Sequence, residues 1–354
     1  MTGGDQMIDL VSDTVTKPTP QMRKAMAEAE VGDAQRGEDP SVNRLLDAVC
    51  ELLGKEAALF LPSATMGNQI AYKVCTKPGD EIIMDRRSHP IHFEGGSPAF
   101  LSGVMIWGLD GDRGVFSQED VLAAIRPDDP HSPRTRVVSI ENTHNLCGGK
   151  VWPLGKLLDV CEAARDNGLS VHMDGSRLMN AVVASGVSAR EIASGADSVT
   201  LCFSKGLGAP VGAALAGSKD FIKEARRCQQ VFGGAMRQAG IIAAGAHYGL
   251  EHHVECLADD HANAKLLAEG LAQEPGIGLN SAEVETNIIY FQVGGTGMTA
   301  HDFADRLKER GVRMGAYKDG RIRAVTHLDI SRTDILTAVD AVHSVLADFR
   351  PGRG

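Results

Sequence analysis

The fold is decided by two stretches that end in charged residues, LSVHMDGSR at 169–177 and SVTLCFSKGLG at 198–208. Each begins as a short apolar run rich in β-branched residues and leaves that run through a small-residue turn. Asp174 closes the first run, and Lys205 follows the second. In parallel α/β sheets ligands bind outside the carboxyl ends of the strands. We therefore expect this carboxylate and this amine to face one pocket.

Further apolar runs of the same kind flank these two. They are AALFLP (57–62), EIIM (81–84), VMIW (104–107), RVVSIE (136–141) and VGAALAG (211–217). Amphipathic stretches alternate with them, which is typical of helices packed on both faces of a mostly parallel sheet. The helix starts carry capping signals, such as Asp39 before Pro40. We predict an α/β large domain that occupies residues 1–254 together with the N-terminal segment.

The pattern changes near residue 255, where a long polar helix begins. The elements expected from there on are a polar helix at 257–273, a strand at 287–293, a helix that starts at Thr299 and Asp302, a strand at 321–325 and a last helix from Ser331. Ser331 and Asp334 have the spacing of a capping box. A smaller C-terminal α+β domain is therefore predicted over residues 255–354.

Composition excludes several classes of protein. The 354 residues carry a formal net charge of −10, so the chain lacks the positive field that attracts nucleic acid or anionic lipid. Seven cysteines at irregular spacings contain no Cys-x-x-Cys pair, which favours free thiols in a reducing compartment. No apolar run approaches the about 18 residues of a membrane span. We expect a soluble, cytoplasmic protein that binds neither nucleic acid nor membrane.

The position of Lys205 is unusual, because it follows an apolar strand and precedes a glycine turn. An ammonium group is normally exposed to solvent. Desolvation lowers the pKa of a lysine and frees its amine as a nucleophile, which can form a Schiff base with an aldehyde. Asp174 fits the carboxylate that keeps the ring nitrogen of pyridoxal phosphate (PLP) protonated. Spacing alone leaves a structural Asp–Lys ion pair open as the alternative.

Other parts of a PLP site can be sought in the same way. The turn SATMGN at 63–68 offers a helix N-terminus and the Thr65 hydroxyl to a phosphate, although it also fits a plain turn. His89 follows the EIIM strand and could cover the ring, although a surface-loop histidine is the default. His144 follows the RVVSIE strand. His89 and His92 lack a clear third ligand, so no metal site is predicted.

Eight strings taken together resemble the L-threonine aldolase family of fold-type-I PLP enzymes, in order and over nearly the whole chain. They are MIDLVSDTVTKP (7–18), VGDAQRGEDPSVNRL (31–45), GKEAALFLPSATMGN (54–68), ENTHN (141–145), HMDGSR (172–177), SKGLGAPVG (204–212), GGAMRQ (233–238) and VTHLDISR (325–332). The resemblance implies an aspartate aminotransferase-like large domain, PLP as cofactor, and cleavage of β-hydroxy-α-amino acids to glycine and an aldehyde.

The resemblance also implies roles for particular residues. Lys205 matches the Schiff-base lysine, Asp174 the pyridinium carboxylate, and His89 the ring-stacking histidine. His144 matches a second histidine near the substrate hydroxyl. The group that holds the substrate carboxylate is matched by Ser12, Arg177 and Arg323, and Arg177 with Ala64 and Thr65 completes the predicted cofactor contacts. We expect His89 or His144 to take the hydroxyl proton, with His144 nearer the hydroxyl.

Three positions depart from the family pattern. Arg36 stands where an aromatic residue is usual, Ala64 replaces a common glycine, and Gln230 replaces a frequent lysine. These departures bear on aldehyde size and stereochemical preference, and Arg36 could recruit an acidic or polar group of the substrate. The expected activity is low-specificity threonine cleavage. The alternatives are a phenylserine-type aldolase or a β-eliminating lyase of the same family, and, from another class, a catalytically silent scaffold.

The resemblance also implies an oligomer. Enzymes of this fold type usually build each site at a subunit boundary, so we expect a homodimer or a homotetramer. The expected partner besides a second copy of the chain is a small amino-acid substrate.

Overall fold

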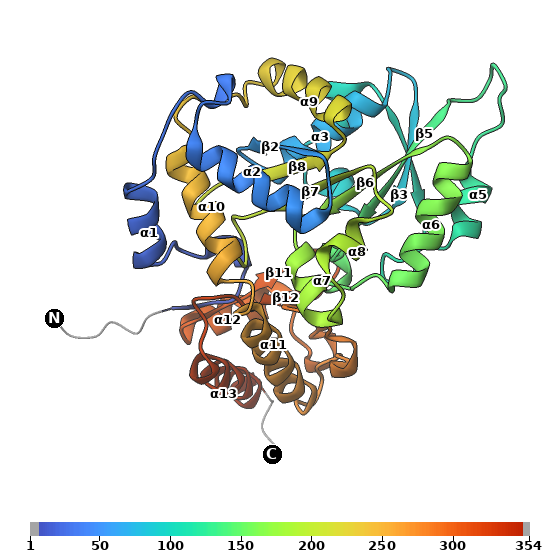
Figure 1. The fold of residues 1–354 in the computed structure, drawn as a ribbon. Coiled ribbons are helices and arrows are strands. Elements are labelled where there is room, and N and C mark those ends of the chain that lie inside the picture. The colour runs from blue at the N-terminus through green and yellow to red at the C-terminus, as the bar shows by residue number, and fades with distance from the viewer. Residues whose placement is uncertain (1–6, 350–354) are drawn as a thin grey trace.

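A seven-stranded sheet forms the centre of the larger part of the molecule in this computed structural model, which describes residues 7–349 (Figure 1). Its strands, in spatial order, are β2 (Ala57–Leu61), β8 (Ala213–Gly217), β7 (Ser198–Cys202), β6 (Ser170–Gly175), β5 (Thr135–Glu141), β3 (Glu81–Asp85) and β4 (Met105–Leu109). Strand β8 runs antiparallel to both of its neighbours, and the remaining pairs are parallel. The predicted mostly parallel α/β sheet is confirmed, and each predicted strand lies where its apolar run does.

Helices cover both faces of this sheet, because its strands alternate their side chains between two cores. Phe60 of β2 packs in the same core as Leu45 of helix α2, whereas Leu59 and Leu61 pack with Ile70 of α3. A strand buried on both faces has no polar face, which explains the continuous apolar runs. The helices of this part are α1 (Pro20–Ala27), α2 (Pro40–Leu53), α3 (Ala64–Cys75), α4 (His89–His92), α5 (Gln118–Ala124), α6 (Leu154–Asp166), α7 (Leu178–Ser185), α8 (Ala189–Ala193), α9 (Lys219–Val231) and α10 (Gly240–His252).

Capping side chains set several helix starts as predicted. Asp39 accepts a hydrogen bond from the Val42 amide at 3.0 Å, directly before Pro40 begins α2. Capping boxes begin α5 and α8. Each such cap satisfies amides that the first helical turn leaves without an intrahelical partner.

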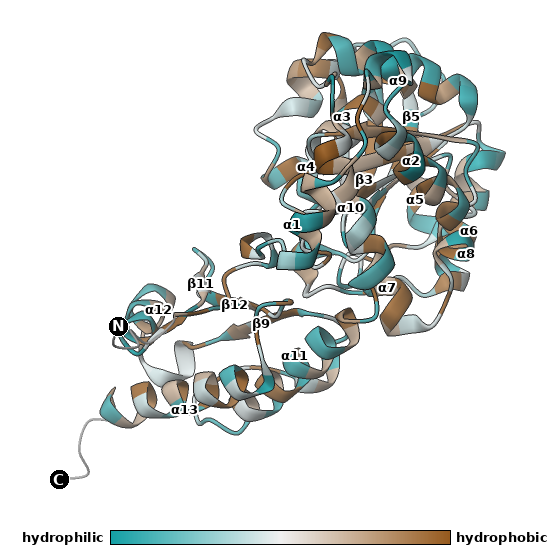
Figure 2. Cartoon of the chain, turned by 60° about the vertical axis from the view of Figure 1, so that its left-hand side comes forward, coloured by the Kyte–Doolittle hydropathy of each residue, from teal (hydrophilic) through white to brown (hydrophobic). Residues whose placement is uncertain are grey.

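The smaller part of the molecule has its own apolar core around a three-stranded antiparallel sheet (Figure 2). Its strands are β11 (Gly315–Ala316), β12 (Arg321–Val325) and β9 (Ile288–Gln292), and its helices are α11 (Leu257–Ala272), α12 (Ala300–Glu309) and α13 (Arg332–Phe349). The side chains of Ser331 and Asp334 are hydrogen-bonded at 2.6 Å at the start of α13, in agreement with the predicted capping pair.

The N-terminal segment joins this smaller part. Strand β1 (Ile8–Asp9) pairs in parallel with β10 (Val312–Arg313), and Ile8 and Leu10 lie in the small core. The prediction groups this segment with the large domain instead. The predicted domain boundary at residue 254 stays a prediction. Strand β1, which that prediction assigns to the large domain, packs with the smaller part of the molecule.

Two further properties concern the chain as a whole. All seven cysteines lie among the described residues, and all seven are free thiols. None of the helices between residues 7 and 349 has both the length and the apolar character of a membrane span.

Candidate active site

Asp174 and Lys205 lie at the same edge of the sheet, as the order of the strands requires. Asp174 is the penultimate residue of β6 and pairs in register with Thr200 of the adjacent parallel strand β7. Lys205 follows the end of β7 by three residues. The Thr16 hydroxyl donates to the Lys205 carbonyl at 2.9 Å, so the N-terminal segment holds the turn that carries the lysine.

Asp174 is almost completely buried, with 2% of its surface exposed. Its Oδ2 accepts a hydrogen bond from Asn68 Nδ2 at 2.8 Å, and its Oδ1 accepts one from the Ser176 amide at 3.0 Å. Burial raises the pKa of Asp174, but the positive charges of His89 and Lys205 and these two hydrogen bonds lower it by more. The net result is a pKa below the ordinary value. The carboxylate is therefore ionised and can accept a hydrogen bond from a cationic group.

His89 begins the short helix α4, directly after strand β3. Its Nδ1 lies 2.9 Å from Glu94 Oε1, and its backbone amide donates to Glu141 Oε2 at 2.7 Å. Burial lowers the pKa of His89, while Glu94, Asp174 and Glu141 together raise it above its ordinary value. The side chain is 28% exposed, and Nε2 has no hydrogen-bond partner among the described residues.

The predicted phosphate turn lies at the N-terminus of α3. Ser63 caps the helix by accepting from the Met66 amide, and the Ala64 and Thr65 amides belong to the first turn, which has no intrahelical partners. A Cβ at Gly67 would lie 2.7 Å from Thr200 Oγ1, so only glycine allows α3 this close to β7. The helix N-terminus is thereby held against the sheet edge that carries the lysine turn.

The predicted carboxylate-binding arginines come together on one amide oxygen. Arg177 Nη1 and Arg323 Nη2 both donate to Asn145 Oδ1, at 3.3 and 2.8 Å. Arg177 also forms a two-bond ion pair with the fully buried Asp13, at 2.6 and 2.7 Å. Arg323 Nε is buried and has no hydrogen-bond partner among the described residues. Two guanidinium groups in this arrangement suit one carboxylate.

Ser12 sits at the edge of this group. Its hydroxyl accepts from the Thr14 amide and lies 3.5 Å from Asp13 Oδ1. The neighbouring Val11 carbonyl accepts from Arg323 Nη1 at 3.1 Å. The N-terminal segment thus brings Ser12 beside the two arginines.

His144 forms no side-chain hydrogen bond with another predicted site residue in the described part of the chain. Its ring is completely buried, its Nε2 lies 3.4 Å from Asp85 Oδ1, and a Cβ at Gly114 would lie 2.2 Å from its Cδ2. Burial lowers the pKa of His144, but Glu141, Asp85 and Cys147 raise it to about 10. Its predicted contact with a substrate hydroxyl stays a prediction.

Cys147 completes a group with Asp85 and His144 whose ligand atoms lie within 4.8 Å of one another. Arg87 donates to both oxygens of Asp85, at 3.1 and 3.2 Å. The carboxylate that a bound cation would require is therefore already paired with a guanidinium group. A second such group contains His89, Glu94 and Asp174.

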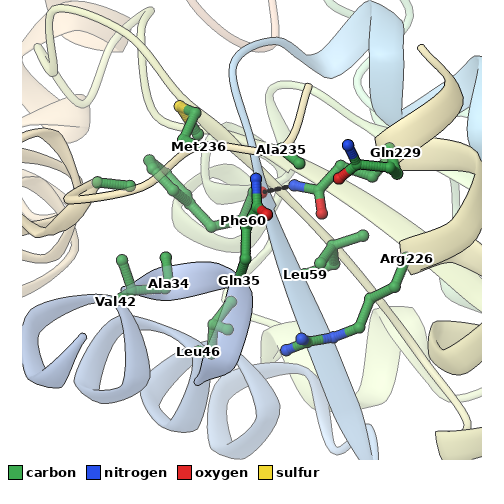
Figure 3. A pocket seen from close by; sticks show the side chains of 12 residues that line it. Ala34, Gln35, Val42, Leu46, Leu59, Phe60, Arg226, Gln229, Ala235 and Met236 are labelled. Carbon is green, nitrogen blue, oxygen red and sulfur yellow. Dashed lines mark hydrogen bonds between the residues drawn. The ribbon is translucent and has the colours of Figure 1, made fainter. Parts of the chain in front are cut away.

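One of the three departures from the family pattern lies at a separate pocket. Gln230 lines it together with Gln35, the neighbour of Arg36, and with Phe60, Arg226 and Met236. Figure 3 shows these side chains around the pocket, where Gln229 Nε2 donates to the Phe60 carbonyl at 2.8 Å. None of the predicted site residues lines this pocket.

Comparison with known proteins gives this arrangement a family. The model of the family described as β-eliminating lyase matches residues 9–293. The chain belongs to the β-eliminating lyase family. Members of this family are PLP-dependent enzymes of fold type I, so this protein is a PLP-dependent lyase.

Individual relatives agree with this assignment. The lyase is 43% identical to the probable low-specificity L-threonine aldolase 2 of Arabidopsis thaliana, over 93% of this chain and 94% of that protein. It is 42% identical to the low specificity L-threonine aldolase of Escherichia coli strain K12, over 93% and 96%. The solved structure of Leishmania major threonine aldolase shares its fold, with a TM-score of 0.81, 21% identity and coverage of 96% and 99%.

The residues of the lyase fit PLP. The buried carboxylate of Asp174 has no arginine or lysine partner among the described residues, which suits a protonated ring nitrogen. Thr200 Oγ1 is buried without a hydrogen-bond partner at the same edge. Ala64 of α3 packs there with Cys202 of β7 and Ala213 of β8.

Several residues that contact the predicted site residues had no role in the sequence interpretation. Among them are Asp13, Asn68, Glu94 and Asn145. Asp13, Asn68 and Asn145 lie inside motifs that suggested the site, whereas Glu94 lies five residues after His89. The sequence could have indicated these residues, because they are acidic or amide side chains close to predicted site residues. It could not indicate which side chain each one contacts, because those contacts join elements that are distant in the chain.

Proposed function

We propose that this lyase is a low-specificity L-threonine aldolase, which cleaves L-threonine, L-allo-threonine and related β-hydroxy-α-amino acids to glycine and an aldehyde. One observation carries the proposal: relatives with that name match the chain over 93% of its length at 42% identity or more. The site also supplies the groups that this reaction requires, namely an amine, a ring carboxylate, a carboxylate clamp and a histidine.

The cofactor would be held by residues from three elements. Lys205 would bond to its aldehyde, Asp174 would face its ring nitrogen, and His89 would cover its ring. Ala64 and Thr65 at the start of α3 would bind its phosphate. PLP, when bound, withdraws the electron pair that the broken Cα–Cβ bond leaves at Cα.

The substrate carboxylate would bind between Arg177 and Arg323, with the Ser12 hydroxyl at the edge. The amide oxygen of Asn145 already marks the point on which both guanidinium groups converge, at 3.3 and 2.8 Å. Asp13 keeps Arg177 in that orientation. Binding there would fix which bond of the substrate stands perpendicular to the ring, and so which bond breaks.

Cleavage requires the β-hydroxyl proton to leave, and a histidine is suited to accept it. His89 is the better supported of the two candidates, because Glu94 occupies its Nδ1 and Nε2 has no hydrogen-bond partner among the described residues. His144 is completely buried against Asp85 and would have to move to touch a substrate. At the end of the cycle the amine of Lys205 would displace glycine.

We also propose that the protein is a cytoplasmic homodimer or homotetramer with its sites at the subunit interface. Two apolar side chains beside His89 support an interface there, because Ile91 is 36% and Phe93 46% exposed. Light scattering of the purified protein would test the oligomeric state.

A second candidate is a β-eliminating lyase, which the description of the matching family favours. A phenylserine-type aldolase is the other form of the same chemistry. Both would use Lys205 and Asp174 in the same way and would differ in the side chain that leaves.

The deciding experiment incubates the PLP-loaded protein with L-threonine, L-allo-threonine and phenylserine and measures the aldehydes released. Comparable rates for the first two substrates are expected, and a Lys205→Ala variant is expected to lose activity together with the visible absorbance of the bound cofactor. Ammonia and a keto acid in place of aldehyde would favour the eliminating lyase. A wild-type protein with no visible band after PLP is added would overturn the proposal.

A further inference from the structure

Glu94 is a buried carboxylate that is hydrogen-bonded to three side chains, those of His89, Asn68 and Gln69. Its side chain is 0% exposed. Its Oε1 lies 2.9 Å from His89 Nδ1 and also accepts a hydrogen bond from Asn68 Nδ2 at 2.9 Å. Its Oε2 accepts from Gln69 Nε2. Among the described residues no lysine or arginine pairs with it, so its charge is balanced by hydrogen bonds and by His89.

Asn68 carries the connection on to Asp174. One hydrogen of its amide group goes to Glu94, and the other goes to Asp174 Oδ2 at 2.8 Å. Its amide oxygen lies 3.0 Å from His172 Nε2, whose Nδ1 in turn lies 2.9 Å from Ser198 Oγ. Burial lowers the pKa of His172 to about 4, so this ring is neutral and donates from Nε2. The Asn68 amide therefore has only one orientation that satisfies all its neighbours.

We propose that Glu94 is a positioning residue of the cofactor site, which fixes His89 and Asp174 relative to one another through Asn68. This inference rests on the proposed cofactor site. His89 would lie over the face of the ring and Asp174 at its nitrogen, so the two define where the ring can sit. A connection of three hydrogen bonds, through Glu94 and Asn68, sets that geometry before the cofactor arrives.

For His89, the consequence is a defined tautomer. A carboxylate at Nδ1 keeps the proton on that nitrogen, which leaves Nε2 as the atom that can accept a proton when the ring is neutral. The charged groups that face the ring are Glu94 from its own segment, Glu141 from β5 and Asp174 from β6. Glu94 is the one of the three that bonds the ring itself, at 2.9 Å.

For Asp174, the consequence is a fixed orientation of the carboxylate. Oδ2 accepts one hydrogen bond from Asn68 and Oδ1 accepts one from the Ser176 amide, so each oxygen keeps lone-pair capacity for a ring nitrogen. Asn68 also separates two buried carboxylates whose oxygens lie within 4.8 Å of each other. Without the bridging amide, repulsion would favour a proton on one of them.

The test compares Glu94→Gln with a matched control, Glu81→Gln. Glu81 is also completely buried, but it pairs with Arg126 at the opposite end of β3. The equilibrium between holoenzyme and free PLP is measured from the visible absorbance. Glu94→Gln is expected to raise the dissociation constant of PLP about tenfold or more, in the range that outer hydrogen-bond partners contribute. Glu81→Gln is expected to leave it within about twofold, although it destabilises the fold.

A second readout follows the His89 ring directly by 15N NMR, with its signals assigned from their loss in a His89→Asn variant. Glu94→Gln is expected to lower the pKa of His89 and to mix its two tautomers. If Glu94→Gln fails to fold, Asn68→Ala tests the same connection without changing the charge, and the same rise in the PLP dissociation constant is expected.

Two outcomes would overturn the inference. One is an unchanged PLP dissociation constant and an unchanged His89 ring in the variant. The other is an equal loss of PLP affinity in Glu81→Gln, which would make the effect one of general stability. Neither readout uses substrate, so a failure of threonine cleavage leaves the test intact, whereas a wild-type protein that binds no PLP would overturn the proposed function itself.

Discussion

The two halves of the candidate site are built in different ways. The ring-binding half, with Asn68, Glu94, His89 and Asp174, lies within the larger part of the molecule, on α3, on α4 and the segment after it, and on β6. The carboxylate-binding half takes its residues from the N-terminal segment, from the residues after β5 and β6, and from β12 of the small sheet. A movement of the smaller part relative to the larger one would leave the ring-binding half unchanged. The same movement would separate the residues of the carboxylate-binding half, because they come from both parts.

The charge pattern of the two halves differs as well. The ring-binding half pairs buried carboxylates with amides and a histidine, and the clamp pairs Asp13 with Arg177 inside the protein. A buried ion pair contributes to stability chiefly because either partner alone would be costly. The clamp is therefore the half in which a single change should cost the most stability. Three predictions test this difference, and a fourth concerns Arg36, which lies outside both halves.

The largest effect on stability is expected for Asp13→Asn, which leaves the guanidinium of Arg177 buried without its partner. A loss of about 3–5 kcal/mol in the free energy of unfolding is expected, measured by urea denaturation at pH 7. The control is Glu30→Gln, which breaks the exposed pair with Arg44 and should cost less than about 1 kcal/mol. Equal losses in the two variants would contradict the contrast.

Arg323→Lys tests the clamp without removing its charge. Lysine cannot reproduce the planar fork of arginine, so the KM for L-threonine is expected to rise by roughly 10- to 100-fold, which corresponds to about 1.5–3 kcal/mol for one charge-assisted hydrogen bond. The PLP dissociation constant should not change. Arg321→Lys is the matched control, because Arg321 lies two residues away on β12 and stacks on Tyr290. The same rise in KM for both variants would assign the effect to the strand rather than to the clamp.

The two halves should respond to pH in opposite directions. Burial raises the pKa of Asp13, but Arg177 holds it well below the ordinary value of 3.8, so its stabilisation is complete above about pH 4 and is lost as pH falls. The pKa of His89 lies above the ordinary value of 6.5, so its stabilisation is complete below about pH 6 and is lost as pH rises through the shifted pKa. Unfolding free energies from pH 3 to pH 9 should show a flatter acid limb in Asp13→Asn and a flatter alkaline limb in His89→Asn. A wild-type slope that neither variant changes would speak against both assignments.

The smallest effect is expected for Arg36→Tyr, which restores the aromatic residue usual in the family. The Arg36 side chain is 73% exposed and its nearest acidic partner, Asp33, is 3.8 Å away, so stability should change by less than about 0.5 kcal/mol. The relative rates on substrates with acidic or polar side chains are expected to fall. An unchanged substrate profile would show that Arg36 does not recruit such groups.

The strands were predictable because their signal is local. Each of the seven central strands coincides with an apolar run, and the last two helices, α12 and α13, begin at the expected caps Thr299 and Ser331. The antiparallel direction of β8 was not predictable, since a run of apolar residues does not record strand direction. The two-residue strands β1, β10 and β11 were missed because two residues carry no period.

The site was predictable only where strand ends carry it. Asp174 and Lys205 could be paired because consecutive parallel strands end at one edge of the sheet. Asp13 and Arg177 are 164 residues apart, and Asn145 and Arg323 are 178 apart. No pattern in the chain relates residues at such separations, so the predicted substrate clamp lacked both the ion pair that orients it and the amide on which it converges.

The sequence by itself determined the alternation of strands and helices, the capping of the helices and the residues at the strand ends, because all of these follow from neighbours within a few positions. The tertiary structure decided which charges meet. In the folded chain His144 is buried beside Asp85, and Glu94 is hydrogen-bonded to both His89 and Asn68. The N-terminal strand packs in the small core. Pairing of charges depends on burial and on distance in space, and both arise only when separate elements pack together.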